Sequence, residues 1–273
     1  MTLRYTAVAM PQEWDDFMAW ALPQLGLRWQ GYRRVRGQVR KRLARRCAAL
    51  HLDGPQAYRQ RLDADDAEWH HVAVAAQITV SRLLRDAPAW HALAEELCAE
   101  LVAGEPLRVW CAGCAGGEEA YSWALLWRHV LEPRLPGLTL QVMATDVRAQ
   151  QLERARRGVY AAGTLREVPD AWRARSFEPQ QGGWRVRQSL ASMVRFELQD
   201  LLAQAPAGEF DVIACRNLAF TYFDERQQRR TADVLRERLR ERGWLFLGRG
   251  EHLPQGAPGF CASRAVPHAY RRT

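Results

Sequence analysis

The sequence predicts an α/β protein with a mostly parallel sheet, a small all-helical domain before the sheet domain and a short β-hairpin inserted in it. Before residue 100, apolar residues recur at the three-to-four-residue spacing of helices. After Pro106, short β-rich runs alternate with helical stretches, which predicts right-handed βαβ units and a mostly parallel sheet. Gly182-Gly183, between two strand-like runs, indicates the hairpin. We therefore expect a helical domain over residues 1–88 and an α/β domain over 89–273, with the insert at approximately 160–198.

The helices of the first part follow from apolar spacing and from the residues that interrupt it. The spacing predicts one continuous helix from Arg28 to Leu50. Asp86 has the character of an N-cap, with Pro88 in the first turn of a helix that runs to about Val102. The shorter helices expected between these two cover Gln56–Leu62 and Asp65–Gln77.

The α/β part is predicted from runs of β-branched and aromatic residues separated by helical stretches. The expected strands are Leu107–Ala112, Leu138–Ala144 with Thr145-Asp146 at its end, Phe210–Cys215 and Gly243–Gly248. The expected helices are Glu118–Leu131, Ala149–Arg157 and Arg226–Arg240. The interval from Gly158 to Asp200 fits this alternation less well, which is why we assign an insert there.

Composition excludes several classes of protein. Hydrophobic residues make up 48% and charged residues 26% of the 273 residues, as in ordinary globular proteins. No apolar run approaches the ~18 residues of a membrane span, and acids appear too early for a signal peptide. Six cysteines in a chain of this size do not suggest a disulfide framework. We expect a cytoplasmic protein that is not embedded in a membrane.

The positive charge is concentrated in one segment. The net charge is +8, yet nine basic residues and no acid lie between Arg28 and Arg46, so the remainder of the chain is nearly neutral. A nucleic-acid enzyme would be expected to spread positive charge around its cleft, so we expect no nucleic-acid partner. The segment is either a solvated helix face or a docking surface for an acidic partner, and we favour docking through Arg36, Arg40 and Arg42.

A glycine-rich turn is the first motif that indicates chemistry. Gly113-Cys-Ala-Gly-Gly117 joins a predicted strand to a predicted helix, where glycines allow a ligand to approach the backbone closely. The spacing departs from G-x-G-x-x-G, and no lysine follows as in a P-loop. Glu118 and Glu119 would repel a pyrophosphate but suit the cationic amino-acid tail of S-adenosylmethionine. Asp146, at the end of the next strand, lies where an acid binds ribose hydroxyls, so a nucleoside cofactor is favoured.

Several motifs in order resemble one family. They are Trp110–Ser122 (WCAGCAGGEEAYS), Ala144–Asp146 (ATD), Leu152–Tyr160 (LERARRGVY), Phe210–Asn217 (FDVIACRN) and Gly243–Leu253 (GWLFLGRGEHL). Together with the basic helical first domain and the insert, they look like the chemotaxis-receptor methyltransferases of the CheR type. The resemblance implies a Rossmann-like S-adenosylmethionine-dependent methyltransferase domain, S-adenosylhomocysteine as product, and glutamate side chains of a chemoreceptor-like acidic helical bundle as methyl acceptors.

The resemblance also implies roles for individual residues. Glu118 would hold the amino end of the cofactor and Asp146 its ribose, beside Gly113 of the turn. Arg85 would lie nearest the reacting groups, with Tyr222 as its companion in catalysis. The other residues that match cofactor-binding positions are Thr79, Ser81, Asp200, Leu201, Arg216 and Asn217, with Arg85 counted in this group as well.

Departures from the family pattern leave the acceptor open. Leu83 and Leu84 replace two phenylalanines, Thr79 replaces an asparagine, and the stretch from Arg216 to Phe223 is one residue longer. A methyltransferase of the same fold that acts on a small molecule, and a non-catalytic cofactor-binding module, are therefore the alternatives. We expect no metal, because the C-x-x-C of Cys111 and Cys114 has no second pair.

Overall fold

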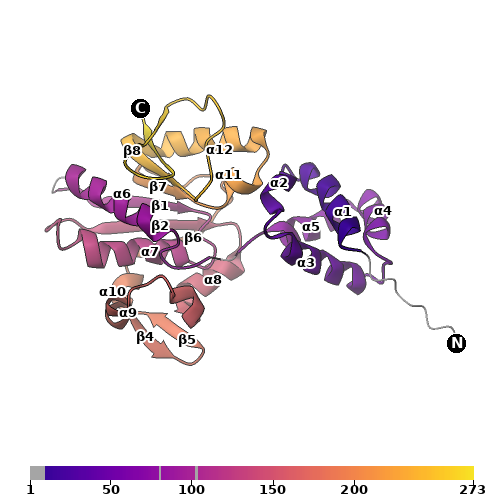
Figure 1. Ribbon diagram of the computed structural model, residues 1–273, viewed down its shortest axis with the longest axis horizontal. Coiled ribbons are helices and arrows are strands. Elements are labelled where there is room, and N and C mark those ends of the chain that lie inside the picture. The colour runs from indigo at the N-terminus through magenta and orange to yellow at the C-terminus, as the bar shows by residue number, and fades with distance from the viewer. Residues whose placement is uncertain (1–9, 80, 102–103) are drawn as a thin grey trace. The chain divides into compact units, whose positions relative to one another are not determined.

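The computed structural model describes residues 10–79, 81–101 and 104–273 (Figure 1). Contacts divide the chain into two compact units. The first holds the residues up to Ile78 together with Thr221–Arg226, and the second holds Thr79–Phe220 and Gln227–Thr273. This division falls after Ile78, ten residues before the domain boundary expected from the sequence, which stays a prediction. Among the described residues, no helix is both long and apolar enough to cross a bilayer.

The first unit is helical, as predicted. Its elements are α1 (Pro11–Gln24), α2 (Trp29–Tyr32), α3 (Arg36–Ala49), α4 (Pro55–Ala64), the 3₁₀ turn η1 (Asp66–Glu68) and α5 (Trp69–Ala76). Their apolar faces meet in one core, in which Met18, Val39, Tyr58, Leu62 and Val72 are at most 1% exposed. Helices shorter than about 15 residues are marginal alone, so this shared core is what holds them.

The continuous helix expected from Arg28 to Leu50 was wrong, because the structure breaks it between α2 and α3. A distant segment packs against the first part of this stretch. The backbone of Arg28 donates to the carbonyl of Tyr222 at 2.8 Å, and Asp224 donates to Gly26 at 2.8 Å. A Cβ on Gly31 would lie 2.1 Å from the Thr221 carbonyl oxygen, so only glycine allows this approach. The local sequence contains no signal for a segment almost two hundred residues away.

The second unit is built on a seven-stranded sheet with the order β6-β2-β1-β7-β8-β10-β9. The first five strands in this order are parallel, and β10 is antiparallel to both of its neighbours, β8 and β9. The strands are β1 (Leu107–Ala112), β2 (Leu140–Asp146), β6 (Val194–Leu198), β7 (Phe210–Cys215), β8 (Leu239–Leu247), β9 (Phe260–Ala262) and β10 (Ala269–Arg272). The helices beside this sheet are α6 (Ala87–Glu100), α7 (Glu118–Leu126), which continues as the π-helical turn η2 (Trp127–Leu131), and α8 (Ala149–Arg157). Helices α11 (Ala219–Tyr222) and α12 (Glu225–Arg238) follow β7, and their residues from Thr221 to Arg226 are grouped with the first unit.

The predicted α/β class and parallel core are confirmed. Helices α6 and α7 pack on the face of the sheet formed by Val109, Val142 and Val212. Three strands of this sheet were missed, namely β6, β9 and β10. Strand β6 lies inside the stretch that we assigned to the insert, so its alternating apolar and charged residues were not assigned to the main sheet.

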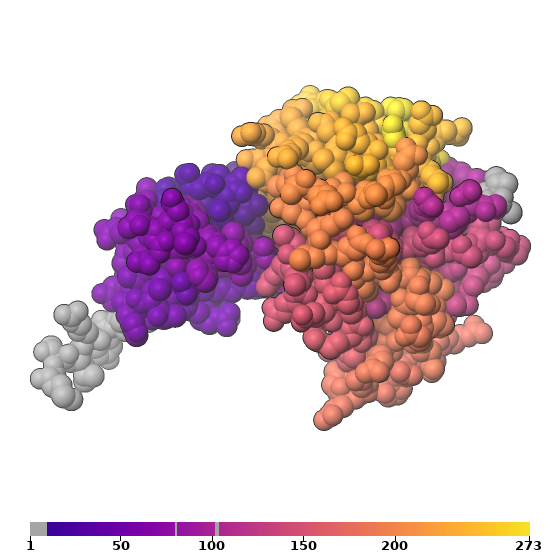
Figure 2. All heavy atoms as spheres, turned by 180° about the vertical axis from the view of Figure 1, so that it is seen from behind, coloured from indigo at the N-terminus to yellow at the C-terminus, as the bar shows by residue number. Residues whose placement is uncertain are grey.

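The predicted hairpin insert is present as a separate three-stranded sheet with the order β3-β5-β4. Its strands are β3 (Val159–Tyr160), β4 (Phe177–Gln180) and β5 (Gly183–Val186), and its helical turns are η3 (Ala162–Leu165), α9 (Asp170–Ser176) and α10 (Gln188–Ala191). The insert projects from the rest of its unit as a narrow extension (Figure 2). A Cβ on Gly183 would meet the Tyr160 carbonyl oxygen at 2.2 Å, which explains a glycine where β5 meets β3.

Candidate functional site

The carboxyl ends of four neighbouring parallel strands carry most of the predicted site residues. The glycine turn follows β1, Asp146 ends β2, Asp200 and Leu201 follow β6, and Arg216 follows β7. The chain passes from β1 to β2 on one side, and β7 pairs with β1 on the other. Such a reversal of strand order is where open α/β sheets bind ligands.

The glycine turn is organised by bonds within the protein. The N–H groups of Gly113 and Cys114 both donate to the Thr145 carbonyl at 2.9 Å, and that of Gly117 donates to Cys114. A Cβ on Gly113 would lie 2.2 Å from the Leu218 side chain. Glycine is therefore needed here for close packing and positive φ, and most of these N–H groups are not available to a ligand as the sequence suggested.

Asp146 links the turn to the second strand. Its carboxylate accepts from the backbone N–H of Ala115 at 2.8 Å and from that of Arg148 at 2.9 Å. Burial raises the pKa of this carboxyl, whereas these two backbone bonds lower it. A carboxylate has lone pairs for about two further donors, so ribose hydroxyls can be bound in addition. Asp146 thus has a structural role besides the predicted one.

The segment after β6 lies beside Asp146. The Gln199 N–H donates to the Asp146 carbonyl at 3.1 Å, and the Asp200 carboxylate accepts from the Leu202 N–H at 2.9 Å. Leu201 is buried, whereas Asp200 is exposed. Among the described residues, the buried Gln199 Oε1 has no hydrogen-bond partner. A buried acceptor of this kind is suited to a ligand amino group, and the sequence analysis missed it.

The two glutamates after the turn have different surroundings. Glu118 is completely buried and accepts from Arg154 at 2.6 Å through Oε1, while its buried Oε2 has no partner in the described part of the chain. Glu119 lies in different surroundings, with Arg216 at 3.8 Å and with Arg85 and Glu251 near enough to influence it electrostatically. Burial is the main reason that the pKa of Glu119 is raised to about 7. Glu119 therefore lies among the predicted site residues, although the sequence analysis chose Glu118.

Arg216 is the centre of a buried charge cluster. Its side chain is 3% exposed and donates to Asp86 at 3.0 Å and to the Arg85 carbonyl at 3.0 Å. Its guanidinium also lies over the rings of Trp90, at 5.1 Å, and Phe246, at 4.6 Å. Asp86 is the N-cap residue of α6, as predicted, but its carboxylate accepts from Arg216 and makes no capping hydrogen bond to the helix.

Backbone strain gathers at the same place. Four residues other than glycine have left-handed φ values here, namely Leu84 (52°), Asp86 (65°), Ala115 (46°) and Asn217 (56°). Such conformations cost on the order of 1–3 kcal/mol each and persist only when surrounding contacts enforce them. The contacts are visible, since Leu84 N–H donates to Ser122 Oγ at 2.8 Å and Asn217 N–H donates to Glu251 at 2.7 Å. Strain held in this way is a common feature of functional sites.

The segment that leads to Arg85 is partly core and partly exposed. Leu83 and Leu84, which replace the two phenylalanines of the family, are 0% and 4% exposed and pack in the core. The Arg85 side chain remains 34% exposed, with Asp86 at 4.0 Å. Thr79 and Ser81 are partly exposed and flank Val80, which is outside the described residues.

Tyr222 belongs to the helical unit. Its ring packs against that of Tyr32, with centroids 4.8 Å apart, and its carbonyl accepts from Arg28. Its role as the companion of Arg85 stays a prediction.

The three arginines predicted to dock a partner are held within their own unit. Arg36 pairs with Asp15 at 3.1 Å, Arg40 lies 3.7 Å from the same carboxylate, and Arg42 donates to the carbonyls of Ala75 and Gln77. Arg40 and Arg42 are therefore only partly exposed, whereas Arg36 remains exposed, and the docking role of all three stays a prediction. Four other basic residues of this segment are exposed and have no charged partner among the described residues, namely Arg33, Arg34, Lys41 and Arg45.

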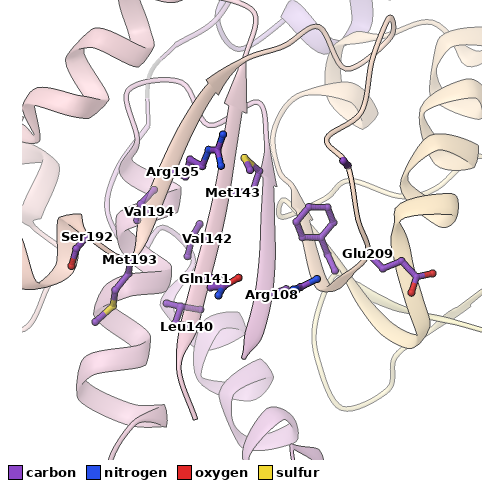
Figure 3. Close-up of a pocket in the computed structure, with 12 residues that line it drawn as sticks. Arg108, Leu140, Gln141, Val142, Met143, Ser192, Met193, Val194, Arg195 and Glu209 are labelled. Carbon is purple, nitrogen blue, oxygen red and sulfur yellow. The ribbon is translucent and has the colours of Figure 1, made fainter. Parts of the chain in front are cut away.

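The structure gives no sign of a metal centre among the described residues, and the hollow drawn in Figure 3 lies away from the candidate site. Within the described residues, no three metal-ligating side chains come together, and burial raises the pKa of the Cys111 and Cys114 thiols. The hollow, of about 330 Å³, lies at the amino ends of β2, β6 and β7, the opposite edge of the sheet (Figure 3). Of its two arginines, Arg195 is paired with Glu197 at 2.7 Å.

Taken together, a glycine turn, an acid at the end of the second strand and buried orphan acceptors define an S-adenosylmethionine-dependent methyltransferase of the Rossmann-like class. The family model described as "CheR methyltransferase, SAM binding domain" matches residues 79–265. The chain belongs to the CheR methyltransferase family.

Named relatives agree with this assignment. The chain is 36% identical over 229 residues to a "Chemotaxis protein methyltransferase" of Salmonella typhimurium, covering 80% of this chain and 76% of the relative. It is 31% identical over 221 residues to "Chemotaxis protein methyltransferase 2" of Pseudomonas aeruginosa, covering 79% and 78%. An uncharacterized 104.1 kDa protein of Rhodobacter capsulatus is 32% identical over 223 residues, which are 80% of this chain but only 23% of that protein.

Proposed function

We propose that this protein transfers the methyl group of S-adenosylmethionine to glutamate carboxylates of a chemoreceptor-like protein. The observation that carries the proposal is Arg85, a partly exposed cation on a strained loop beside the buried Arg216–Glu119 pair. A glutamate acceptor is ionised at neutral pH and needs no general base. It needs a cation that aims it, and a guanidinium can bind a carboxylate through two hydrogen bonds. The names of the chemotaxis relatives support the same acceptor class.

The residues of the site fit the cofactor. When bound, S-adenosylmethionine supplies a methyl group on a positively charged sulfur that a carboxylate can attack directly. Asp146 would bind the ribose hydroxyls, and the orphan Gln199 Oε1 would accept from the adenine amino group. Glu119, rather than Glu118, would hold the ammonium group, because Glu119 lies near Arg216 and Arg85, whereas Glu118 lies against Arg154. Arg216 would hold the cofactor carboxylate from its buried position.

Arg85→Ala is expected to lower turnover at least about tenfold, the loss that follows when a charged orienting group is removed. The affinity for S-adenosylhomocysteine, measured by calorimetry, should change much less. Turnover is measured with a radiolabelled methyl group and a chemoreceptor fragment, and the product should release its label in mild base, as methyl esters do. Label that is stable to base would contradict esterification, and unchanged turnover would contradict the role of Arg85.

The exposed basic residues of the helical unit are expected to attract the acidic protein acceptor. Reversing Arg33, Arg34 and Arg45 to glutamate should raise the KM for the protein acceptor and remove its dependence on salt, because such attraction acts over a Debye length of about 8 Å at physiological ionic strength. Steady-state kinetics at several salt concentrations measure this effect.

The control variant reverses Arg157, Arg230 and Arg264, which are also exposed, so both variants change the net charge equally. Equal changes of KM in the two variants would contradict a specific role of the helical unit, because net charge alone would then explain the effect. No change in either variant would favour a small-molecule acceptor, the main alternative.

A further inference from the structure

The glycine turn is held from outside by helix α8 and strand β3. The Tyr160 hydroxyl donates to the Gly116 carbonyl at 2.6 Å, and Arg154 pairs with Glu118 at 2.6 Å. The Arg154 guanidinium also lies 5.6 Å from the centre of the Tyr160 ring. Tyr160 is 1% exposed and belongs to the three-stranded sheet of the insert. The insert is thus connected directly to the cofactor turn.

The two glycines at the end of the turn provide the space for these contacts. A Cβ on Gly116 would lie 2.7 Å from Arg154 Nη1, and a Cβ on Gly117 would lie 2.8 Å from the Ala155 Cβ and 3.0 Å from the Tyr160 hydroxyl. Gly117 also has a φ of +87°. These glycines therefore serve the packing of α8 and β3 against the turn, in addition to any approach by the cofactor.

The Gly116 carbonyl shares a peptide plane with the Gly117 N–H, which donates to Cys114 at 2.9 Å and closes the turn. Helix α7 begins at the next residue with no side-chain cap, so its first turn depends on this peptide. Gly116 is buried, and its carbonyl would lose a close hydrogen bond without the Tyr160 hydroxyl. Two adjacent glycines have the backbone freedom to adopt another conformation once that bond is gone.

We infer that Tyr160 is a positioning residue for S-adenosylmethionine, which it does not touch. Its hydroxyl fixes the Gly116–Gly117 peptide, and this peptide sets the start of α7 and the direction of Glu119. The inference rests on the proposed placement of the cofactor at this turn. It also means that the insert contributes to cofactor affinity through Tyr160.

The test is Tyr160→Phe, which removes one hydroxyl and keeps the buried ring. We expect the Kd for S-adenosylhomocysteine, measured by calorimetry, to rise about tenfold, the effect of one buried carbonyl that loses its partner. Hydrogen exchange of the turn, residues 113–118, should become faster, and turnover at saturating cofactor should stay within about twofold of the parent because Tyr160 acts on binding.

Tyr121→Phe is the matched control. The Tyr121 hydroxyl is also buried and donates at 3.0 Å to a backbone carbonyl, but that carbonyl belongs to Ala155 in α8 and not to the turn. We expect a similar loss of thermal stability in both variants and a change in Kd only in Tyr160→Phe. Equal Kd values in the two variants, or exchange that is faster throughout the insert but not in the turn, would overturn the inference. A parent protein that does not bind S-adenosylhomocysteine would instead contradict the proposed function.

Discussion

Replacing Arg216 with methionine is expected to lower the free energy of unfolding by about 3–5 kcal/mol, because the change leaves buried carboxylates without their cation. The Arg216 side chain is 3% exposed. It pairs with the carboxylates of Asp86 and Glu119 and donates a hydrogen bond to the Arg85 carbonyl. The decrease in the free energy of unfolding should be largest above pH 7, where Glu119 is ionised. Urea unfolding at pH 8, followed by tryptophan fluorescence, measures it. Binding of S-adenosylhomocysteine should be lost at the same time.

Arg240→Met is the control for this experiment. Arg240 also pairs with an aspartate, Asp211, at 2.8 Å, but its side chain is 33% exposed. Solvent screens such a pair, so its loss should cost less than about 1 kcal/mol. Equal destabilisation by the two changes would contradict the view that the Arg216 cluster is a buried, tightly coupled group.

Cofactor affinity is expected to fall steeply as the pH drops below 7. Burial raises the pKa of Glu119 to about 7, Glu251 raises it further, and Arg216 and Arg85 lower it. Above pH 7 the carboxylate is charged and attracts the cofactor ammonium, whereas below pH 7 it is neutral. Each further decrease of one pH unit below pH 7 should then raise the Kd of the cofactor by up to about tenfold. Calorimetry with S-adenosylhomocysteine between pH 8 and pH 5.5 measures the slope, and the heat should depend on the buffer because binding releases a proton.

Two variants identify the glutamate that is responsible. Glu119→Gln should bind weakly at pH 8 and show almost no dependence on pH. Glu118→Gln should keep the pH dependence of the parent, although it breaks the pair with Arg154. The reverse pattern would show that Glu118 holds the ammonium, as the sequence analysis expected.

The prediction of the fold succeeded where local pattern and burial coincide. Leu107–Ala112, Ala149–Arg157 and Phe210–Cys215 have the predicted bounds, since buried parallel strands and a strongly amphipathic helix have clear local signatures. Strands β6 and β9 lie at the two edges of the sheet, and β10 lies between β8 and β9. All three are only three to five residues long, so they give little local signal, and their positions depend on pairing with β2, β8 and β10.

For the site, the sequence located the segments but could not distinguish neighbouring side chains. It identified the glycine turn, Asp146 and Arg216, which the sheet order brings to adjacent strand ends. It could not separate Glu118 from Glu119, because adjacent helical residues point in directions about 100° apart and only packing decides which direction faces the site. The structure shows that Arg154 pairs with Glu118 and that Glu119 lies near Arg216, which is the basis for proposing Glu119.

The sequence by itself determined the α/β class, the methyltransferase family and the chemical type of the site, because glycines, acids and apolar periods act over a few neighbouring residues. Only the tertiary structure decided which charges are committed to internal contacts. Arg36 is bound by Asp15, Asp86 is bound by Arg216, and Thr221–Arg226 join the helical unit. Each of these contacts joins residues distant in sequence, and its geometry is fixed by the packing of whole elements, which no local pattern contains.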